Sequence, residues 1–402
     1  MAADKQDKVL NVPTLRFPEF TGEWEESTIG KEFELYSGNT PSRLDKENYV
    51  GDVNWITSGE LKEHYIGDTK EKISERSAKE NNLRLMPEGT FVIAIYGLEA
   101  EGVRSTGSII SKQSTISQAC MAFTPKGGIS NEFLYAWYKK HGNVIGIRYA
   151  QGTKQQNLSY DIIEKFRIRY PSQKEQDKLN SFISLLDTRI STQIRIIKEI
   201  QSLIYGITQR ISKHPSIRMT MLSELLVERD EKNTALYPVY SVSVSEGVVN
   251  QIDYLGRSFA ATDTSHYNVV HKGDIIYTKS PTGEFPLGIV KRSSVGSNVA
   301  VSPLYGVYKP VSDDVAIYLH YYFCSPLNAR NYLHKLIQKG AKNTINITNQ
   351  RFLENHIPLP DKTTLSRFVE LMNAVSAKLK SERSLLEALQ RQKKYLLTHM
   401  FV

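Results

Sequence analysis

The sequence predicts an α+β protein: two duplicated, mixed α/β domains joined by a long antiparallel two-helix coiled coil, with pseudo-two-fold symmetry. Three observations predict this fold. Two long proline-free stretches, 172–214 and 361–402, carry apolar residues in alternating steps of four and three, a spacing that places them on one stripe of a helix. Before each stretch, short strand-like runs alternate with turn signals. The order of motifs in the first half recurs in the second.

The first long stretch begins with a capping-box pattern, in which Ser172 bonds an unpaired N–H and Glu175 reaches back to the helix start. The second stretch begins at Asp361, a plausible N-cap. One such apolar pattern alone could belong to an ordinary core helix, but two patterns in matching register favour a coiled coil. Polar seam residues usually fix that register, and two of them, Gln193 and Glu382, fall opposite each other when the stretches are aligned. The predicted seam comprises Ile183, Leu186, Ile190, Gln193, Ile197, Ile204, Met372, Val375, Leu379, Glu382 and Leu386.

Length and composition indicate a soluble globular protein. The chain has 402 residues, of which 40% are hydrophobic and 23% charged, enough for two domains and their connectors. The polar start MAADKQDK does not resemble a signal peptide, and the longest apolar run, near Phe91, is too short to span a bilayer. We therefore expect a cytoplasmic protein with no membrane contact. The two cysteines, Cys120 and Cys324, are expected to be buried free thiols.

The repeat divides the chain into five parts. They are an N-terminal arm (1–20), a first domain (21–171), a central helix (172–214), a second domain (215–360) and a C-terminal helix (361–402). About 40 helical residues would make a rod of about 60 Å. Antiparallel pairing would place one domain at each end, and domains about one DNA turn (about 34 Å) apart could read two half-sites separated by unread bases. Because the two domains differ in sequence, such a target could be asymmetric.

Catalytic and cofactor motifs are absent from the sequence. There is no G-x-x-x-x-G-K-[ST] loop for nucleotide phosphates, and no Asn- or Asp-Pro-Pro-aromatic tetrad of the kind that amino-methyltransferases use. Cysteine and histidine do not fall at metal-ligand spacing. We therefore expect no catalytic residue, no metal and no cofactor in this chain, which favours a recognition protein.

A net charge of +8 suggests a polyanionic partner, although many basic proteins bind no nucleic acid. The duplicated loops GTKQQN and GAKNTIN are the best candidates for DNA contact. Lysine neutralises phosphate, and Gln or Asn can pair with adenine edges. The alternative is a polar loop that only closes the domain. Candidate contacts are Lys154, Gln155, Asn157, Lys342, Asn343 and Asn346 in these loops, and Ser58, Arg104, Lys279 and Thr282 in the divergent segments where base readout is expected.

The opening LRFPEFTGEWEESTIGKEFELYSGNTP and the segment that runs from GTKQQNLS into the first long stretch resemble the specificity subunit of type I restriction–modification enzymes. The strongest part is Glu175-Gln176 followed by Leu-Leu-Asp ending at Asp187. The degenerate second copy lacks the Glu-Gln pair and has Ser376 in place of the aspartate, which puts partner contacts at that end in doubt.

The resemblance implies a non-catalytic subunit with two target-recognition domains that recognise a bipartite sequence in double-stranded DNA. It implies two modification subunits that use S-adenosylmethionine to methylate adenine, and restriction subunits that use ATP and Mg²⁺ to cleave. A different class remains open: a coiled-coil adaptor whose domains bind proteins without DNA specificity. Steep salt dependence of binding would distinguish DNA recognition from that alternative.

Overall fold

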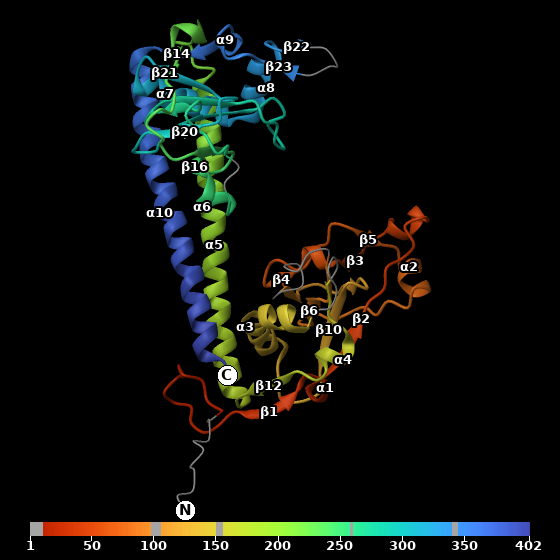
Figure 1. Cartoon of the computed structure of the whole chain (residues 1–402). Helices are drawn as coiled ribbons and strands as arrows, with labels where there is room; N and C mark the ends of the chain where they lie inside the picture. The colour runs from red at the N-terminus through yellow and green to blue at the C-terminus, as the bar shows by residue number, and fades with distance from the viewer. Residues whose placement is uncertain (1–10, 98–105, 150–155, 258–259, 340–344) are drawn as a thin grey trace, which may run out of the picture. The chain divides into compact units, whose positions relative to one another are not determined.

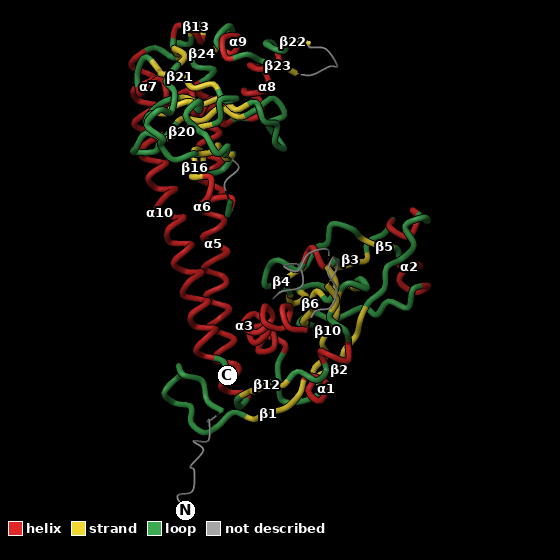
Figure 2. The backbone as a smooth tube through the Cα atoms, in the orientation of Figure 1, coloured by secondary structure: helices red, strands yellow, loops and turns green. Residues whose placement is uncertain are grey.

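A computed structural model describes residues 11–97, 106–149, 156–257, 260–339 and 345–402. The chain forms two compact units, one made of residues 1–194 and 384–402 and the other of residues 195–383. Unit 1 contains head 1 (residues 21–171) and unit 2 contains head 2 (residues 215–360). Each unit also contains a stretch of both long helices, α5 (Gln173–Ile211) and α10 (Lys362–Met400). The strands gather in the heads, as Figure 2 shows. The predicted fold class is confirmed.

Head 1 is built on a five-stranded sheet whose first four strands are antiparallel and whose last pair is parallel. Its order is β2 (Phe33–Ser37), β10 (Cys120–Pro125), β6 (Phe91–Ala94), β8 (Gly107–Ile110), β4 (Tyr65–Ile66). A three-stranded sheet follows the order β5 (Lys72–Ile73), β3 (Val53–Ile56), β9 (Thr115–Ile116). Two separate pairs are β1 (Glu25–Thr28) with β12 (Arg167–Tyr170), and β7 (Tyr96–Gly97) with β11 (Gln156–Asn157). The helices are α1 (Ile29–Glu32), α2 (Glu75–Glu80), α3 (Asn131–Tyr149) and α4 (Tyr160–Ile163).

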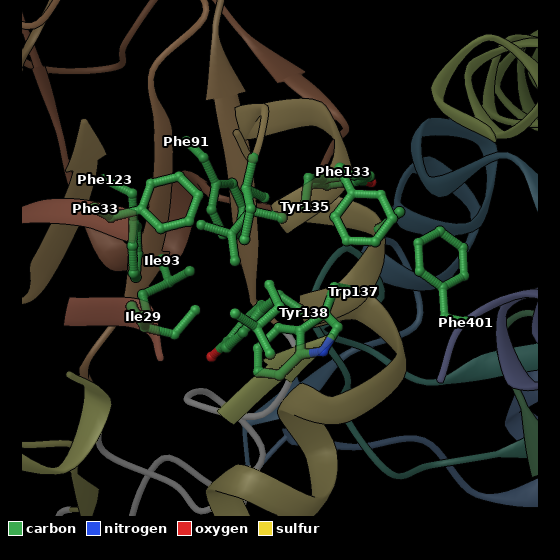
Figure 3. Close-up of a cluster of buried hydrophobic side chains, with 14 of the residues drawn as sticks. Ile29, Phe33, Phe91, Ile93, Phe123, Phe133, Tyr135, Trp137, Tyr138 and Phe401 are labelled. Carbon is green, nitrogen blue, oxygen red and sulfur yellow. The ribbon is translucent and has the colours of Figure 1, made fainter. Parts of the chain in front are cut away.

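The core of unit 1 joins head 1 to the end of α10. Aromatic side chains of the sheet, such as Phe91 and Phe123, pack against α3 (Figure 3). On the other side of α3, the rings of Phe133 and Phe401 lie 5.3 Å apart. Burying aromatic rings of this size is a large stabilising contribution, so residues at the C-terminal end of the chain help to hold head 1 together.

Head 2 repeats the strand order of head 1. Its four-stranded sheet runs β14 (Leu226–Glu228), β21 (Gly306–Pro310), β18 (Ile275–Thr278), β19 (Ile289–Arg292), which matches β2, β10, β6, β8. Gly89 and Gly273, which the sequence repeat aligns, have φ angles of +81° and +90° in the turns before β6 and β18. Such angles favour glycine, so the duplication extends to the backbone of these turns.

The remaining elements of head 2 are short. The strand pairs are β13 (Arg218–Met221) with β24 (His356–Leu359), β15 (Tyr240–Ser243) with β16 (Gly247–Asn250), β17 (Asn268–Val270) with β20 (Val299–Val301), and β22 (Gln338–Lys339) with β23 (Ile345–Asn346). The helices are α6 (Gln251–Leu255), α7 (Asp313–Cys324), α8 (Pro326–His334) and α9 (Asn349–Phe352). Helix α7 takes the place in head 2 that α3 has in head 1, as the repeat predicts.

The two long helices pair antiparallel within each unit, as Figure 1 shows. In unit 1 the beginning of α5 shares a core with the end of α10, through residues such as Ile183 and Leu396. In unit 2 the end of α5 packs with the beginning of α10, through residues such as Ile204 and Met372. None of the predicted seam residues is exposed: Ile183, Leu186, Gln193, Ile197, Met372 and Glu382 are buried, and Ile190, Ile204, Val375, Leu379 and Leu386 are half-buried.

The two helix starts differ from each other. Asp361 caps α10 as predicted, because its carboxylate accepts hydrogen bonds from the backbone N–H groups of Thr363 (2.9 Å) and Thr364 (3.0 Å). The capping box predicted for α5 does not form. Instead, the two oxygens of Glu175 accept hydrogen bonds from Arg16, at 2.8 and 2.7 Å. The Glu175 carboxylate is therefore used to hold the N-terminal arm.

Residues 11–20, which we call the N-terminal strap, bind both long helices within unit 1. Besides the Arg16–Glu175 pair with α5, the backbone N–H of Leu15 donates to the carbonyl of His399 in α10 at 2.9 Å. Phe17 packs edge-to-face against Phe182 of α5, with ring centroids 5.9 Å apart. The strap thus fastens the beginning of the chain to helical turns that lie far away in the sequence.

Candidate nucleic-acid interface

Strands β7 and β11 adjoin, along the sequence, two of the segments that were predicted to contact DNA in head 1. Arg104, Lys154 and Gln155 lie outside the described residues, but the strands next to them are described. Strand β7 pairs antiparallel with β11, with Gly97 opposite Gln156 and Tyr96 opposite Asn157. Segment 98–105 follows Gly97 and segment 150–155 precedes Gln156. Gly97 and Gln156, the described residues next to these two segments, therefore lie opposite each other in the antiparallel pair.

Asn157 is the predicted head 1 contact that the structure places most directly. Its side chain is exposed, whereas the next residue, Leu158, is fully buried. The backbone N–H of Leu158 donates to the carbonyl of Ile95 at 2.8 Å, which continues the β7–β11 pairing. Successive residues of a strand point to opposite faces. Leu158 therefore anchors the strand in the core and leaves the Asn157 amide free to meet a ligand.

Ser58 approaches the same region from another segment. It begins a short 3₁₀ turn, Ser58–Glu60, and is half-buried. Glu60 fixes this turn by accepting hydrogen bonds from the backbone N–H (3.0 Å) and the hydroxyl (2.8 Å) of Thr57. The turn contacts β6, the strand that leads into β7. Ser58 therefore lies in a hydrogen-bonded turn that contacts the strand preceding β7.

In head 2, Lys342 and Asn343 lie outside the described residues. Asn346 lies in β23, opposite Gln338 of β22. Thr282 is exposed and stands in a tight turn, because its backbone exchanges hydrogen bonds of 3.1 and 2.6 Å with Phe285. This turn follows β18, the counterpart of β6. The divergent segment around Thr282 therefore starts from the same sheet position as the divergent segment around Arg104.

Lys279 is less exposed than a lysine that contacts DNA only from the surface of head 2 would be. It is half-buried, and this burial lowers its pKa against a smaller opposing effect of Glu228. Glu228 also accepts a hydrogen bond from the amide of Asn349 at 2.8 Å. Asn349 begins the helix that follows the GAKNTIN segment. Glu228 thus connects the two predicted contact regions of head 2.

The sequence analysis missed a buried polar cluster in unit 1 that is centred on His64. The His64 ring lies between the rings of Tyr65 and Tyr135, with centroids 4.2 and 4.0 Å away. Its Nε2 lies 2.9 Å from Glu132 and its Nδ1 lies 3.0 Å from Asp187. His64, Tyr65, Tyr135 and Asp187 border an open cavity of about 760 Å³ that is also lined by residues of both long helices.

The electrostatics of this cluster favour charged partners. Burial disfavours the imidazolium, but Asp187 and Glu132 outweigh it and raise the pKa of His64. Burial also favours the neutral acid of Asp187, yet His64 and Lys393 lower its pKa below the ordinary value. Lys393 of α10 forms an ion pair with Asp187 of α5. The cluster therefore ties head 1 to both helices within unit 1.

The second copy replaces this ionic cluster with a neutral contact. Ser376, at the position corresponding to Asp187, is hydrogen-bonded to the hydroxyl of Tyr321 in α7. This contact again joins a head to a long helix, now within unit 2. The substitution noted in the sequence is thus accommodated by a different residue of the head.

The described residues contain no candidate metal site and no candidate membrane span. Within them, no three His, Cys, Asp or Glu side chains are grouped so that they could hold a metal ion. No described helix is both long and apolar enough to cross a bilayer. Among the predicted contacts, the exposed groups are the amide of Asn157 and the hydroxyl of Thr282, and proteins use such groups to contact phosphates and base edges.

Comparisons with known proteins agree with this arrangement. The sequence model of the type I restriction modification DNA specificity domain matches residues 21–202. The specificity subunit of the type I restriction enzyme MjaIX from Methanocaldococcus jannaschii is 28% identical over 175 residues, which cover 42% of this chain and 39% of that protein. The EcoR124I/EcoR124II specificity subunit from Escherichia coli is 24% identical over 187 residues, which cover 46% and 45%. The chain thus matches less than half the length of these curated relatives.

The fold similarity extends over nearly the whole chain. The S subunit of a type I restriction–modification system from M. genitalium has a TM-score of 0.58 at 14% identity, with 97% of this chain and 99% of that one covered. A chain from a structural study of the assembly and conformational transition of a type I system has a TM-score of 0.53 at 12% identity, with 93% and 96% covered. Identities this low support the fold alone. Residues 21–202 thus match the type I restriction modification DNA specificity domain, and the fold of the chain resembles that of a type I S subunit.

Proposed function

We propose that this chain recognises a bipartite, asymmetric sequence in double-stranded DNA and directs adenine methylation and ATP-dependent cleavage by partner subunits. The observation that carries the proposal is the duplicated head, in which one strand order is kept while the segments beside it differ. A common framework with two different surfaces suits two different half-sites. In this proposal each head reads one half-site from the loops beside its sheet.

The differences between the heads support an asymmetric target. Head 1 adds a fifth strand, β4, and a three-stranded sheet to the shared four-stranded order, whereas head 2 surrounds that order with short two-stranded pairs. A homodimer of one head would need a palindromic target. Two heads that are no longer alike remove this requirement.

The proposed division of labour leaves the chemistry to partner subunits. Two copies of a modification subunit would bind S-adenosylmethionine and methylate an adenine that is flipped out of the duplex. Restriction subunits would supply ATP- and Mg²⁺-dependent cleavage. This chain would contribute sequence recognition and the two long helices as a docking surface and spacer, and it would act in the cytoplasm, where the DNA is.

Binding measurements with the assembled methyltransferase would test this proposal. Fluorescence anisotropy would compare a duplex that contains the target, identified by sequencing methylated adenines in cells, with duplexes that carry either half-site scrambled. We expect each scrambled half-site to weaken binding at least about tenfold, since one mismatched base pair already costs about 1–3 kcal/mol. Equal affinity for all duplexes would refute sequence recognition.

The salt dependence of the same titration separates DNA recognition from a protein adaptor. Each phosphate that the protein neutralises contributes about −0.9 to the slope of log affinity against log salt concentration. A steep slope for the target duplex supports the proposal. A partner protein whose binding is insensitive to both salt and DNA sequence would favour the adaptor.

A further inference from the structure

An open cavity of about 610 Å³ lies within unit 2, between head 2 and the stretches of α5 and α10 that belong to this unit. Head residues Lys291, His320 and Cys324 border it, together with the α10 residues Ser376 and Arg383. Of the two cysteines that were predicted to be buried thiols, Cys120 is fully buried, but Cys324 is only partly buried. Both thiols are free as predicted, the predicted burial was wrong for Cys324, and this residue borders the open cavity.

Lys291 gives the first reason to regard Cys324 as an anion. Its side chain comes from β19 and is only 5% exposed, and its Nζ donates to Cys324 Sγ at 3.3 Å. The sulfur is the one hydrogen-bond or ion-pair partner found for this ammonium in the part of the chain that the structure describes. A buried charge requires a compensating group. A thiolate at Cys324 provides it.

His320 gives the second reason, through its tautomer. The backbone N–H of Arg292 donates to His320 Nδ1 at 3.3 Å, so Nδ1 is the unprotonated acceptor. The ring proton of a neutral imidazole then belongs to Nε2, which lies 3.8 Å from Cys324 Sγ. His320 therefore presents an N–H to the sulfur from a direction other than that of Lys291. Two donors and no described acceptor facing one sulfur favour its deprotonated form.

The two cysteines differ accordingly in acidity. Burial alone would raise the pKa of Cys324, but His320 and Lys291 overcome this and lower it to about 6. Burial raises the pKa of Cys120 to about 12, and a hydrogen bond from Ser117 reduces this only in part. Near neutral pH, one thiol is thus a nucleophile beside a cavity and the other is an inert core residue.

We propose that Cys324 is a site of covalent thiol modification that takes small disulfides bearing a carboxylate. The Cys324 thiolate attacks one sulfur of the disulfide, whose S–S bond breaks. Cys324 gains a new S–S bond, and the other half of the reagent leaves as a thiolate, so no further oxidant or reductant is needed. This reaction removes the negative charge that Lys291 requires. A carboxylate on the attached group replaces that charge, whereas an amine would add a second cation beside Lys291.

The attached group would occupy the space that separates head 2 from the helices within unit 2. Contacts that cross this region include the hydrogen bond between Tyr321 and Ser376, the hydrogen bond from Gln209 to the Ser325 hydroxyl at 3.1 Å, and an ion pair between Arg383 and Glu246 at 3.6 Å. Modification is therefore expected to act on the attachment of head 2 rather than on its sheet.

The test compares two disulfides of similar size and opposite charge, dithiodipropionate and cystamine, on the intact chain. Peptide mapping by mass spectrometry identifies the modified cysteine, and stopped reactions give the rate between about pH 5 and pH 9. We expect modification of Cys324 and not of Cys120. The rate should level off above about pH 7, instead of rising through the ordinary thiol pKa of about 8.5. After division by the rates with free cysteine, dithiodipropionate should react on the order of tenfold faster than cystamine.

Lys291→Met is expected to move the midpoint of the pH–rate profile upward by at least about one unit, because it removes a charge next to the sulfur. Lys291→Arg keeps that charge and serves as the matched control, with a midpoint near that of the wild type. Three results would overturn the proposal. They are a wild-type rate that keeps rising up to about pH 9, no reaction at Cys324 in the folded chain, or equal normalised rates for the two disulfides. All three are measured on the wild type, so the proposal can fail even if a variant does not fold.

Discussion

Replacing Arg16 with alanine is expected to destabilise unit 1 by about 3 kcal/mol, at the lower end of the range for breaking a buried ion pair. The Glu175 side chain is 2% exposed and that of Arg16 is 16% exposed, so water cannot replace the lost guanidinium at the carboxylate. Two hydrogen bonds to Glu175 disappear together with two more, to the carbonyls of Gly22 (2.6 Å) and Thr21 (3.3 Å). The variant leaves a carboxylate without its counter-ion inside the joint between the strap and α5.

Tryptophan fluorescence can follow this unit selectively. The three tryptophans of the chain, Trp24, Trp55 and Trp137, all lie in unit 1. With a urea m-value of about 3 kcal/mol/M, a loss of about 3 kcal/mol lowers the unfolding midpoint by about 1 M. Transitions seen by circular dichroism but not by fluorescence would report on unit 2 and should stay unchanged.

A double-mutant cycle supplies the control. Glu175→Gln removes the charge that Arg16→Ala leaves unpaired, so the double variant should be more stable than Arg16→Ala alone. The reasoning fails if Arg16→Ala shifts the midpoint by less than about 0.2 M, or if the effects of the two substitutions simply add. Either result would mean that the strap contributes little to the stability of α5 and α10.

Three further predictions concern other parts of the molecule. First, the raised pKa of His64 means that its stabilising contribution is complete below its unfolded pKa of about 6.5 and is lost as the pH rises through its folded value. His64→Gln should remove that loss from the pH dependence of the unfolding midpoint. Burial lowers the pKa of Lys139 to about 8, so Lys139 makes stability rise with pH, and this effect is the same in the wild type and in His64→Gln and cancels in the comparison. Identical pH profiles for the two proteins would contradict the ionic role of His64. Second, one heptad added to both α5 and α10 should lengthen the unread spacer of the target by about 3 base pairs, since seven helical residues span about 10.5 Å. Sequencing of methylated adenines measures the spacer length, and an unchanged length would refute the proposal that the two helices set it. Third, Asn157→Ala should weaken target binding by about 1–3 kcal/mol without moving the urea midpoint. Leu158→Ala, its buried neighbour, should do the reverse, and loss of stability in Asn157→Ala would assign that amide a purely structural role.

The long helices could be predicted from the sequence because their signal is local and repeated. Seam residues such as Ile183 and Met372 recur at a fixed spacing, so burial of one helical face follows from the sequence pattern itself. The helix start at Asp361 was predicted for the same reason, because a cap involves neighbours two and three residues away. Glu175 offered the same kind of local pattern but is used by Arg16, which is 159 residues distant along the chain. The sequence pattern alone does not show whether a carboxylate accepts hydrogen bonds from nearby donors or from donors that are distant along the chain.

The candidate interface was predictable only in pieces. The sequence drew attention to Asn157 and Arg104 separately, through loop chemistry and divergence between the repeats. Their neighbouring strands come together through the β7–β11 pairing, a contact between segments about 60 residues apart that depends on the sheet around it. The ring stack at His64 and the thiol environment of Cys324 depend in the same way on residues from several elements. Such clusters have no spacing in the sequence that would indicate them.

The division into units also has a consequence for synthesis on the ribosome. Unit 2 is one continuous segment, whereas unit 1 needs residues 384–402, including Leu396, Met400 and Phe401, to complete its core. Domains that emerge early generally fold first during translation. This protein differs, because head 1 is translated first but its core is complete only after residues 384–402 have been made. Until then, part of the apolar surface of head 1 stays exposed. Chaperone dependence and sensitivity to nascent-chain proteases should therefore concentrate in the half of the protein that is translated first.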